Sequence, residues 1–169
     1  MNDTASDQTA LYITFGLEEE MFAVDVSQVR EILDSTRITK IPRAPEFMRG
    51  VINVRGSVVP VVDMRLKFGI PGAENTVNTR IIVLELNKDG NTVVLGALAD
   101  SVKDVIELEP GQIEEPPRIG SRWRTDFING IGKRNGEFII LLDIDRIFSS
   151  DELAIVEATS AETTVEEGV

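Results

Sequence analysis

Short apolar runs bounded by turn residues follow one another along most of the chain. In residues 11–17, Leu11, Ile13, Phe15 and Leu17 alternate with Tyr, Thr and Gly. This two-residue period is typical of a β-strand with one buried face. Similar runs predict further strands at residues 21–25, 38–41, 51–54, 58–62, 80–86, 92–98, 102–108 and 138–142. The pattern therefore predicts a mainly β protein.

The choice of apolar residues favours a small barrel or sandwich. Val and Ile supply 18 residues each, against 12 Leu, and β-branched side chains suit a pleated sheet. Short strands separated by turns are typical of compact all-β domains. Two small barrels of similar size fit the number of runs, although no internal repeat is legible. We place the approximate divide between them in the loop at residues 70–79.

Helical signals are few and short. Asp25 is a candidate N-cap for one or two turns over residues 26–29, and residues 63–68 predict a short helix that ends at Gly69. Ser150, followed by two acidic residues, resembles a helix start that leads into Leu153, Ile155 and Val156. Beyond residue 159 the sequence is polar and acidic, so we expect that end to fray.

The composition excludes several kinds of site. The chain of 169 residues contains no Cys and no His. Disulfide scaffolds, zinc sites with the usual ligands, cysteine nucleophiles and histidine-based triads are therefore all excluded. A chain of this length can fold around its own core without metal or disulfide.

The charge is unevenly distributed. The net charge is −12. Residues 151–169 carry six acidic and no basic residues, whereas residues 10–150 carry 17 basic and 21 acidic ones. A phosphate backbone or an anionic membrane surface needs a basic partner, so we expect neither as a ligand. We interpret the N-terminal segment 1–10 as a flexible tail and residues 151–169 as an acidic helix or tail that aids solubility.

The sequence predicts a cytoplasmic protein. No stretch approaches the roughly 20 consecutive apolar residues of a membrane-spanning helix. Residues 1–7 contain neither the basic nor the apolar region of a signal peptide.

Carboxylates offer the sharpest hypothesis for a metal site. Asp143 and Asp145 lie two residues apart after an apolar run, and residues two apart on a strand share a face. Together with Asp63 or Asp100 they could hold Mg²⁺. The alternative is that these aspartates end strands and cap turns.

Arg55 is a candidate for a docking surface. It lies in an apolar run that ends at Gly56. A guanidinium in such a run must find a carboxylate or emerge from the surface, because an unpaired buried charge is very costly. Glu31 is the partner that we expect, either in a structural ion pair or at a groove.

Several blocks of the chain, in order, resemble the CheW family of bacterial chemotaxis coupling proteins. The most specific is Gly-Val-Ile-Asn-Val-Arg-Gly at residues 50–56, followed by Val-Val-Pro-Val-Val-Asp-Met-Arg at 58–65. Further blocks lie at residues 20–32, 41–47, 96–105, 127–132 and 140–144. The resemblance covers residues 11–150, which we therefore treat as one domain.

The resemblance implies a fold and an activity. It implies two small five-stranded SH3-like β-barrels packed together, with short helices and a C-terminal helix. It also implies a non-catalytic adaptor, without a cofactor, that couples methyl-accepting chemoreceptors to the histidine kinase CheA. Such a protein would work in receptor arrays at the inner face of the membrane.

The resemblance also implies the binding residues. A groove for the receptor signalling tip would include Val29, Glu31, Gly50, Arg55, Val102, Val105 and Gly130. The contact with the regulatory domain of CheA would lie around Glu114 and Ile119. At these last two positions the sequence departs from relatives that carry a basic residue and an aromatic residue.

Two other interpretations remain open. The chain could be a paralogue that serves a non-flagellar chemosensory pathway. It could instead be an acidic β-barrel that binds a metal or small ligand through Asp63, Asp100 and Asp143, in which case saturating Mg²⁺ should stabilise it by about 2–3 kcal/mol.

Overall fold

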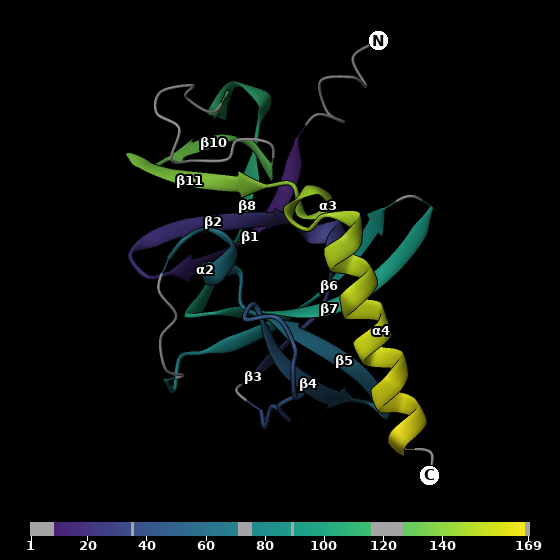
Figure 1. Ribbon diagram of the computed structural model, residues 1–169. Coiled ribbons are helices and arrows are strands. Elements are labelled where there is room, and N and C mark those ends of the chain that lie inside the picture. The colour runs from purple at the N-terminus through teal and green to yellow at the C-terminus, as the bar shows by residue number, and fades with distance from the viewer. Residues whose placement is uncertain (1–8, 35, 71–75, 89, 116–126, 168–169) are drawn as a thin grey trace.

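The computed structural model describes residues 9–34, 36–70, 76–88, 90–115 and 127–167, and over these it is mainly β (Figure 1). The strands are β1 (Ala10–Leu17), β2 (Glu20–Asp25), β3 (Val29–Asp34), β4 (Met48–Val54), β5 (Ser57–Val62), β6 (Arg80–Lys88), β7 (Asn91–Ala99), β8 (Ser101–Leu108), β9 (Ile113–Glu114), β10 (Ile128–Arg134) and β11 (Glu137–Leu142). The helices are η1 (Val26–Gln28), α2 (Met64–Lys67), η2 (Pro110–Gln112), α3 (Ile144–Ile147) and α4 (Ser150–Glu167).

The strands form two barrels, one above the other in Figure 1, with α4 along one side. The first barrel has the strand order β8-β1-β2-β11-β10-β9, and the second has the order β3-β6-β7-β5-β4. The mainly β prediction is confirmed. The first sheet has six strands, one more than expected, because the two-residue strand β9 adds to its edge.

Apolar side chains fill three regions. A main core lies between the barrels and includes Phe15, Phe22, Leu84, Leu95 and Phe148. A smaller cluster around Leu108 and Leu141 fills the first barrel, and another around Val61 and Leu98 fills the second. Within β5 and β11, alternate residues therefore face the inside of a barrel and the main core, as the two-residue period requires.

The chain passes between the barrels at two places that the sequence did not indicate. Strands β1 and β2 belong to the first barrel, β3 to β7 to the second, and β8 to β11 again to the first. The crossings are therefore at residues 26–28 and at Asp100. The loop at residues 70–79, where the sequence analysis placed the divide, connects α2 to β6 within the second barrel.

The two barrels repeat one arrangement at a spacing of 80 residues. Phe47 and Phe127 precede equivalent hairpins, β4–β5 and β10–β11, and the backbone oxygen of each accepts a 2.7 Å hydrogen bond from the backbone N–H of Asp63 or Asp143. Gly50 and Gly130, and likewise Phe68 and Phe148, are also 80 positions apart. In each barrel the inner strand of the hairpin pairs in parallel with a strand from elsewhere in the chain. Few identical residues carry the repeat, which explains why it is not legible in the sequence.

Several predicted elements need correction. Residues 38–41 do not form a strand, since Thr39 makes only an isolated bridge to Val51 and Pro42, next along the chain, has no N–H to donate. The predicted helical turn at residues 26–29 stops at Gln28, and Val29 begins β3. The spacing of apolar residues there fits both the helical and the strand period, and the pairing of β3 with β6 makes this segment a strand. Strand β10 was missed because its glycines resemble a loop, and the backbone of α4 continues to Glu167 rather than fraying.

Candidate functional site

The structure brings Glu31 and Arg55 together, as the sequence predicts. An Arg55 Nη2 to Glu31 Oε1 distance of 3.6 Å joins β3 to the β4–β5 turn, across the two edges of the second sheet. The Arg55 side chain is 83% exposed and that of Glu31 is 28% exposed. The pair is therefore a surface ion pair that leaves most of the guanidinium available to a partner.

Arg55 has a backbone conformation that favours other residues. Arg55 and Gly56 form the two-residue β4–β5 turn with φ values of 53° and 88°. Positive φ at both positions favours Asn-Gly, the pair that the equivalent β10–β11 turn contains at Asn135 and Gly136. A non-glycine residue such as Arg in this region costs about 1 kcal/mol or more. The hairpin thus presents a long cationic side chain where local stability favours Asn.

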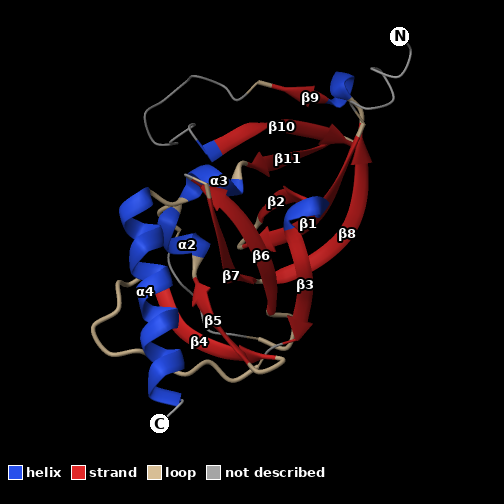
Figure 2. Ribbon diagram, turned by 90° about the vertical axis from the view of Figure 1, so that its right-hand side faces the viewer, coloured by secondary structure: helices blue, strands red, loops and turns tan. Residues whose placement is uncertain are grey.

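The apolar residues of the predicted groove lie on β3 and β8. Val29 and Val102 are half-buried and both pack against the main core, whereas Val105 is 58% exposed. Helix η1, which leads directly into Val29, packs against β1, and β1 pairs with β8. Figure 2 shows β3, β1 and β8 on the same side of the molecule. Val29 and Val102 thus approach the same junction between the barrels.

The two predicted glycines have packing roles. Gly50 is buried with φ of 144°, and a Cβ there would lie 2.1 Å from the backbone oxygen of Thr39. A Cβ on Gly130 would lie 2.7 Å from Ile113 Cγ2 and 3.0 Å from the backbone oxygen of Glu114. Because each glycine lacks a side chain, a neighbouring segment of the chain can lie in close contact with it.

The predicted kinase contact is described in part. Glu114 is an exposed residue of β9, where its carboxylate pairs with Lys133 of β10. Ile119 lies outside the described residues.

The structure contradicts the proposed metal site. Asp63 is fully buried, and its carboxylate accepts hydrogen bonds from Arg65 and Arg49 at 3.0–3.1 Å. Asp100 pairs with the same Arg65 at 2.8 Å, while Asp143 and Asp145 lie at the start of α3 rather than on a strand. Among the described residues, no three acidic side chains are placed to hold a metal ion.

The Arg65 guanidinium therefore supplies the positive charge that the metal hypothesis assigned to Mg²⁺. Hydrogen bonding to Asp63 raises the pKa of Arg65 above its ordinary value, against the effect of burial, and Asp63, Asp100 and Glu18 add favourable charge. The sequence signal was the spacing Asp-x-Arg, in which an N-cap carboxylate can accept from the arginine two residues later.

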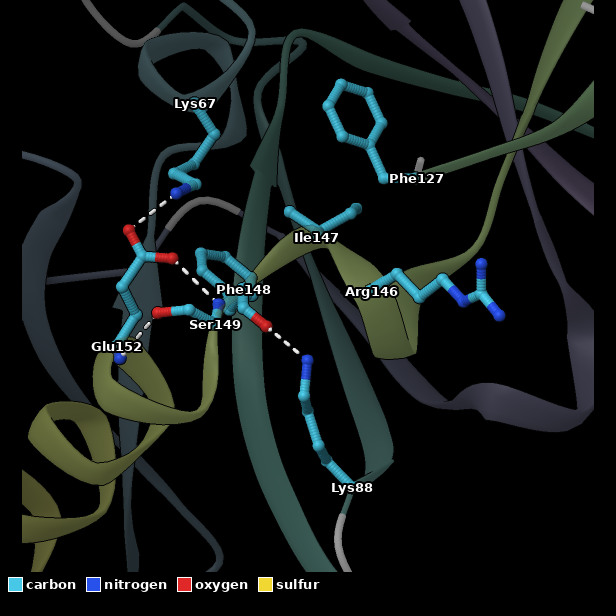
Figure 3. Close-up of a pocket in the computed structure, with 8 residues that line it drawn as sticks. All are labelled: Lys67, Lys88, Phe127, Arg146, Ile147, Phe148, Ser149 and Glu152. Carbon is cyan, nitrogen blue, oxygen red and sulfur yellow. Dashed lines mark hydrogen bonds and ion pairs between the residues drawn. The ribbon is translucent and has the colours of Figure 1, made fainter. Parts of the chain in front are cut away.

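A pocket of about 380 Å³ lies where both barrels meet α4 (Figure 3). Lys67 donates to Glu152 at 2.5 Å and lies over the rings of Phe47 and Phe148, and Lys88 donates to the Phe148 backbone oxygen at 2.9 Å. Sequence reasoning did not find this pocket, because its lining comes from α2, β6, the residue before β10 and the α3–α4 segment. These contacts fasten the start of α4 to the second barrel.

Hydrogen bonds also cap α4. Ser149 Oγ accepts from the Glu152 N–H, and Glu152 Oε1 accepts from the Ser149 N–H. Burial of the Glu152 carboxyl would raise its pKa, but hydrogen bonds from Lys67 and Ser149 hold the pKa of Glu152 below its ordinary value. None of the helices in the described part of the chain is long and apolar enough to cross a membrane.

The similarity of this chain to known proteins extends over both barrels. The family model described as CheW-like domain matches residues 11–152. The chain is 34% identical over 146 residues to the chemotaxis protein CheW of Klebsiella aerogenes, covering 86% of each chain. It is 36% identical over 140 residues to the chemotaxis protein CheW of Rhizobium meliloti, covering 83% of this chain and 88% of that protein.

A solved structure extends the similarity to the fold. The scaffolding protein TtCheW from Thermoanaerobacter tengcongensis superposes with a TM-score of 0.74 and 34% sequence identity, over 85% of this chain and 94% of that chain. Both barrels and the hairpin that bears Arg55 lie within the matched family domain. This chain belongs to the CheW-like family.

Proposed function

We propose that this protein is a non-catalytic adaptor that couples methyl-accepting chemoreceptors to the histidine kinase CheA. The observation that carries the proposal is the CheW-like match over residues 11–152, which includes both barrels and their junction. A scaffold needs surfaces rather than a reactive centre, and the absence of His and Cys from the sequence agrees with this role.

Exposed residues at the junction support a receptor groove there. A receptor signalling tip is a helical hairpin, which presents an apolar stripe with polar flanks. Val105 offers exposed apolar surface, Val29 and Val102 extend it toward the core, and Arg55 offers an accessible cation beside Glu31. The unfavourable backbone conformation of Arg55 adds support, since strain of this kind concentrates at functional positions.

The other end of the first barrel is the proposed contact with the regulatory domain of CheA. Glu114 supports it as an exposed residue on an edge strand, together with the Ile119 segment that the resemblance indicates. We place the working protein in receptor arrays at the inner face of the membrane.

Calorimetric titration tests the proposal directly. The full chain would be titrated with a receptor signalling-tip fragment and, separately, with the regulatory domain of CheA from the same cell. Binding of both at micromolar or better affinity is the expected result. Binding of neither, with partners shown to be folded, would contradict the adaptor role in chemotaxis.

A further inference from the structure

Two polar contacts connect the barrels at the places where the chain crosses between them. In the first, Arg65 of α2 donates to Asp100 Oδ1 at 2.8 Å, and Asp100 Oδ2 accepts from the backbone N–H of Glu18 at 2.6 Å. Asp100 also donates its N–H to the Gly16 backbone oxygen at 2.9 Å. This Arg65 latch joins the second barrel to the β1–β2 turn of the first through the crossing residue Asp100.

In the second contact the residue of the short helix is an acceptor, and its partner at the crossing is a neutral amide side chain. Asp145 Oδ1, on α3, accepts from Gln28 Nε2 at 3.1 Å and from the backbone N–H of Asn87 at 2.9 Å. Gln28 lies in η1, the other crossing, and Asn87 lies at the end of β6. This Asp145 latch joins the first barrel to the β6–β7 hairpin of the second.

The helix residues of the two latches occupy equivalent positions of the structural repeat. Arg65 and Asp145 are 80 positions apart, each in the short helix that follows the β-hairpin of its barrel. Glu18 directly follows β1 and Asn87 is the last residue but one of the corresponding strand β6, while Asp100 and Gln28 directly precede the corresponding strands β8 and β3. Helices α3 and η1 both contact β6.

Each latch lies next to an apolar residue of the proposed groove. Val29 follows Gln28 directly, and Val102 is two residues after Asp100. A hydrogen-bonded group on each crossing fixes where the following strand begins, because the strand has little freedom within one or two residues of an anchored side chain. The separation between Val29 and Val102 therefore depends on both latches.

We propose that Arg65 and Asp145 are positioning residues that set the relative orientation of the two barrels and, through it, the width of the groove between β3 and β8. The statement about the groove rests on the proposed function. The statement about orientation does not.

Spin-label distances test the orientation without any ligand. Because the chain has no cysteine, labels can be introduced at exposed Ser57→Cys on β5 and Glu107→Cys on β8, one in each barrel. A pair at Ser57→Cys and Asn91→Cys reports on the second barrel alone. Each pair would be measured by pulsed electron paramagnetic resonance in the wild-type background and in Asp145→Ala, Asp145→Asn and Arg146→Ala.

Asp145→Ala should broaden the distance distribution between the barrels and leave the distribution within the second barrel unchanged. Asp145→Asn keeps the Oδ1 acceptor and should restore the narrow distribution. Arg146→Ala changes the next residue of the same helix, which is exposed, and should match the wild type. Binding of the receptor fragment should weaken at least fivefold in Asp145→Ala and recover in Asp145→Asn.

A folded Asp145→Ala protein with the wild-type distribution between the barrels would overturn the inference. If that variant does not fold, Gln28→Ala removes the hydrogen bond between Gln28 and Asp145 from the other side and decides the question. A broadened distribution with unchanged receptor affinity would overturn the link to the groove. Failure of the wild type to bind the receptor fragment would contradict the proposed function, and the distances would still decide whether the latches set the orientation.

Discussion

Gly50 and Gly130 hold equivalent positions in the two barrels, yet they tolerate side chains to different degrees. At Gly50 a Cβ would meet the Thr39 backbone oxygen at 2.1 Å, and φ is 144°. At Gly130 the nearest atom is the end of the Ile113 side chain at 2.7 Å, and φ is not in the left-handed region. The family resemblance assigned both residues to receptor binding, and their surroundings also give each a role in packing.

Gly50→Ala should therefore destabilise the protein by about 3 kcal/mol or more, because backbone atoms must move and the conformation disfavours a side chain. Chemical denaturation monitored by circular dichroism measures the change. Gly111→Ala, where no atom lies within 4 Å, is the control and should change the free energy of unfolding by less than about 1 kcal/mol. Equal effects at both positions would contradict the close approach to Thr39.

Arg55→Ala tests whether Arg55 contributes to receptor binding rather than to the stability of the fold. The Arg55 side chain is mostly exposed and its ion pair with Glu31 is long, so loss of the pair should cost less than about 1 kcal/mol of stability. We expect receptor-fragment affinity to fall measurably in calorimetry while the fold stays intact. Asn135→Ala, at the same turn position of the other barrel, is the matched control and should bind normally. Collapse of the folded fraction in Arg55→Ala would make Arg55 chiefly structural.

Helix α4 is the element that departs most from its sequence-based description. The acidic sequence beyond residue 150 resembles a solvated tail, but Leu153 and Val156 are buried in the main core. Three-residue spacing places both on one face of the helix, which packs against β5. The start of the element was predictable from Ser150 and the acids that follow, whereas its docking depends on the surface that the second barrel presents.

Leu153→Ala should lower the free energy of unfolding by about 2–4 kcal/mol, because the removed side chain leaves a cavity in the main core. Ile155→Ala, on the exposed face of the same helix, should cost about 1 kcal/mol or less. Denaturant unfolding of both variants measures the difference. Similar losses would mean that α4 does not dock through the Leu153 face.

Glu152→Gln should weaken the attachment of α4 in a pH-dependent way. The folded-state pKa of Glu152 lies below its ordinary value of 4.5, so the carboxylate stabilises the fold above that pH, and the contribution is lost as the pH falls through the folded-state pKa. At pH 7 the variant should be less stable by about 1 kcal/mol. The difference from wild type should vanish in unfolding experiments carried out well below pH 4.5. A difference independent of pH would contradict a charged interaction with Lys67.

At the scale of the whole molecule, the chain builds one barrel from both of its ends and the other from its middle. Strands β8 to β11 complete the barrel that β1 and β2 begin. The main core takes residues from both barrels and from α3 and α4, so we expect the two barrels to unfold together. The binding surfaces of an adaptor then depend on the relative orientation of the two barrels.

Val105→Asp tests the junction as a binding surface. Val105 is 58% exposed on β8, so a charge there should leave the fold intact. If it contacts the receptor tip, affinity should weaken by about 1–3 kcal/mol in calorimetry. Val77→Asp, at a site 88% exposed and outside the proposed groove, is the control. Unchanged affinity in a folded Val105→Asp protein would remove Val105 from the site.

Much of this protein follows from local sequence. The strand over residues 11–17, the N-cap at Asp25, the short helix after β5 and the start of α4 are decided by neighbouring residues, and the structure confirms each of them. The expected pairing of Glu31 with Arg55 is also confirmed, although Arg55 lies in an exposed turn rather than within the apolar run. The family motifs likewise lie in contiguous blocks.

Tertiary structure alone decided the rest, because the deciding contacts join distant residues. Val29 begins a strand rather than continuing a helix only because β6 pairs with it, and the glycines of β10 form a strand only between β9 and β11. Asp63 and Asp100 could equally have held a metal until the fold placed Arg65 between them. The crossings and the 80-residue repeat depend on the order of the strands in each sheet. The spacing of apolar residues along the chain does not specify that order.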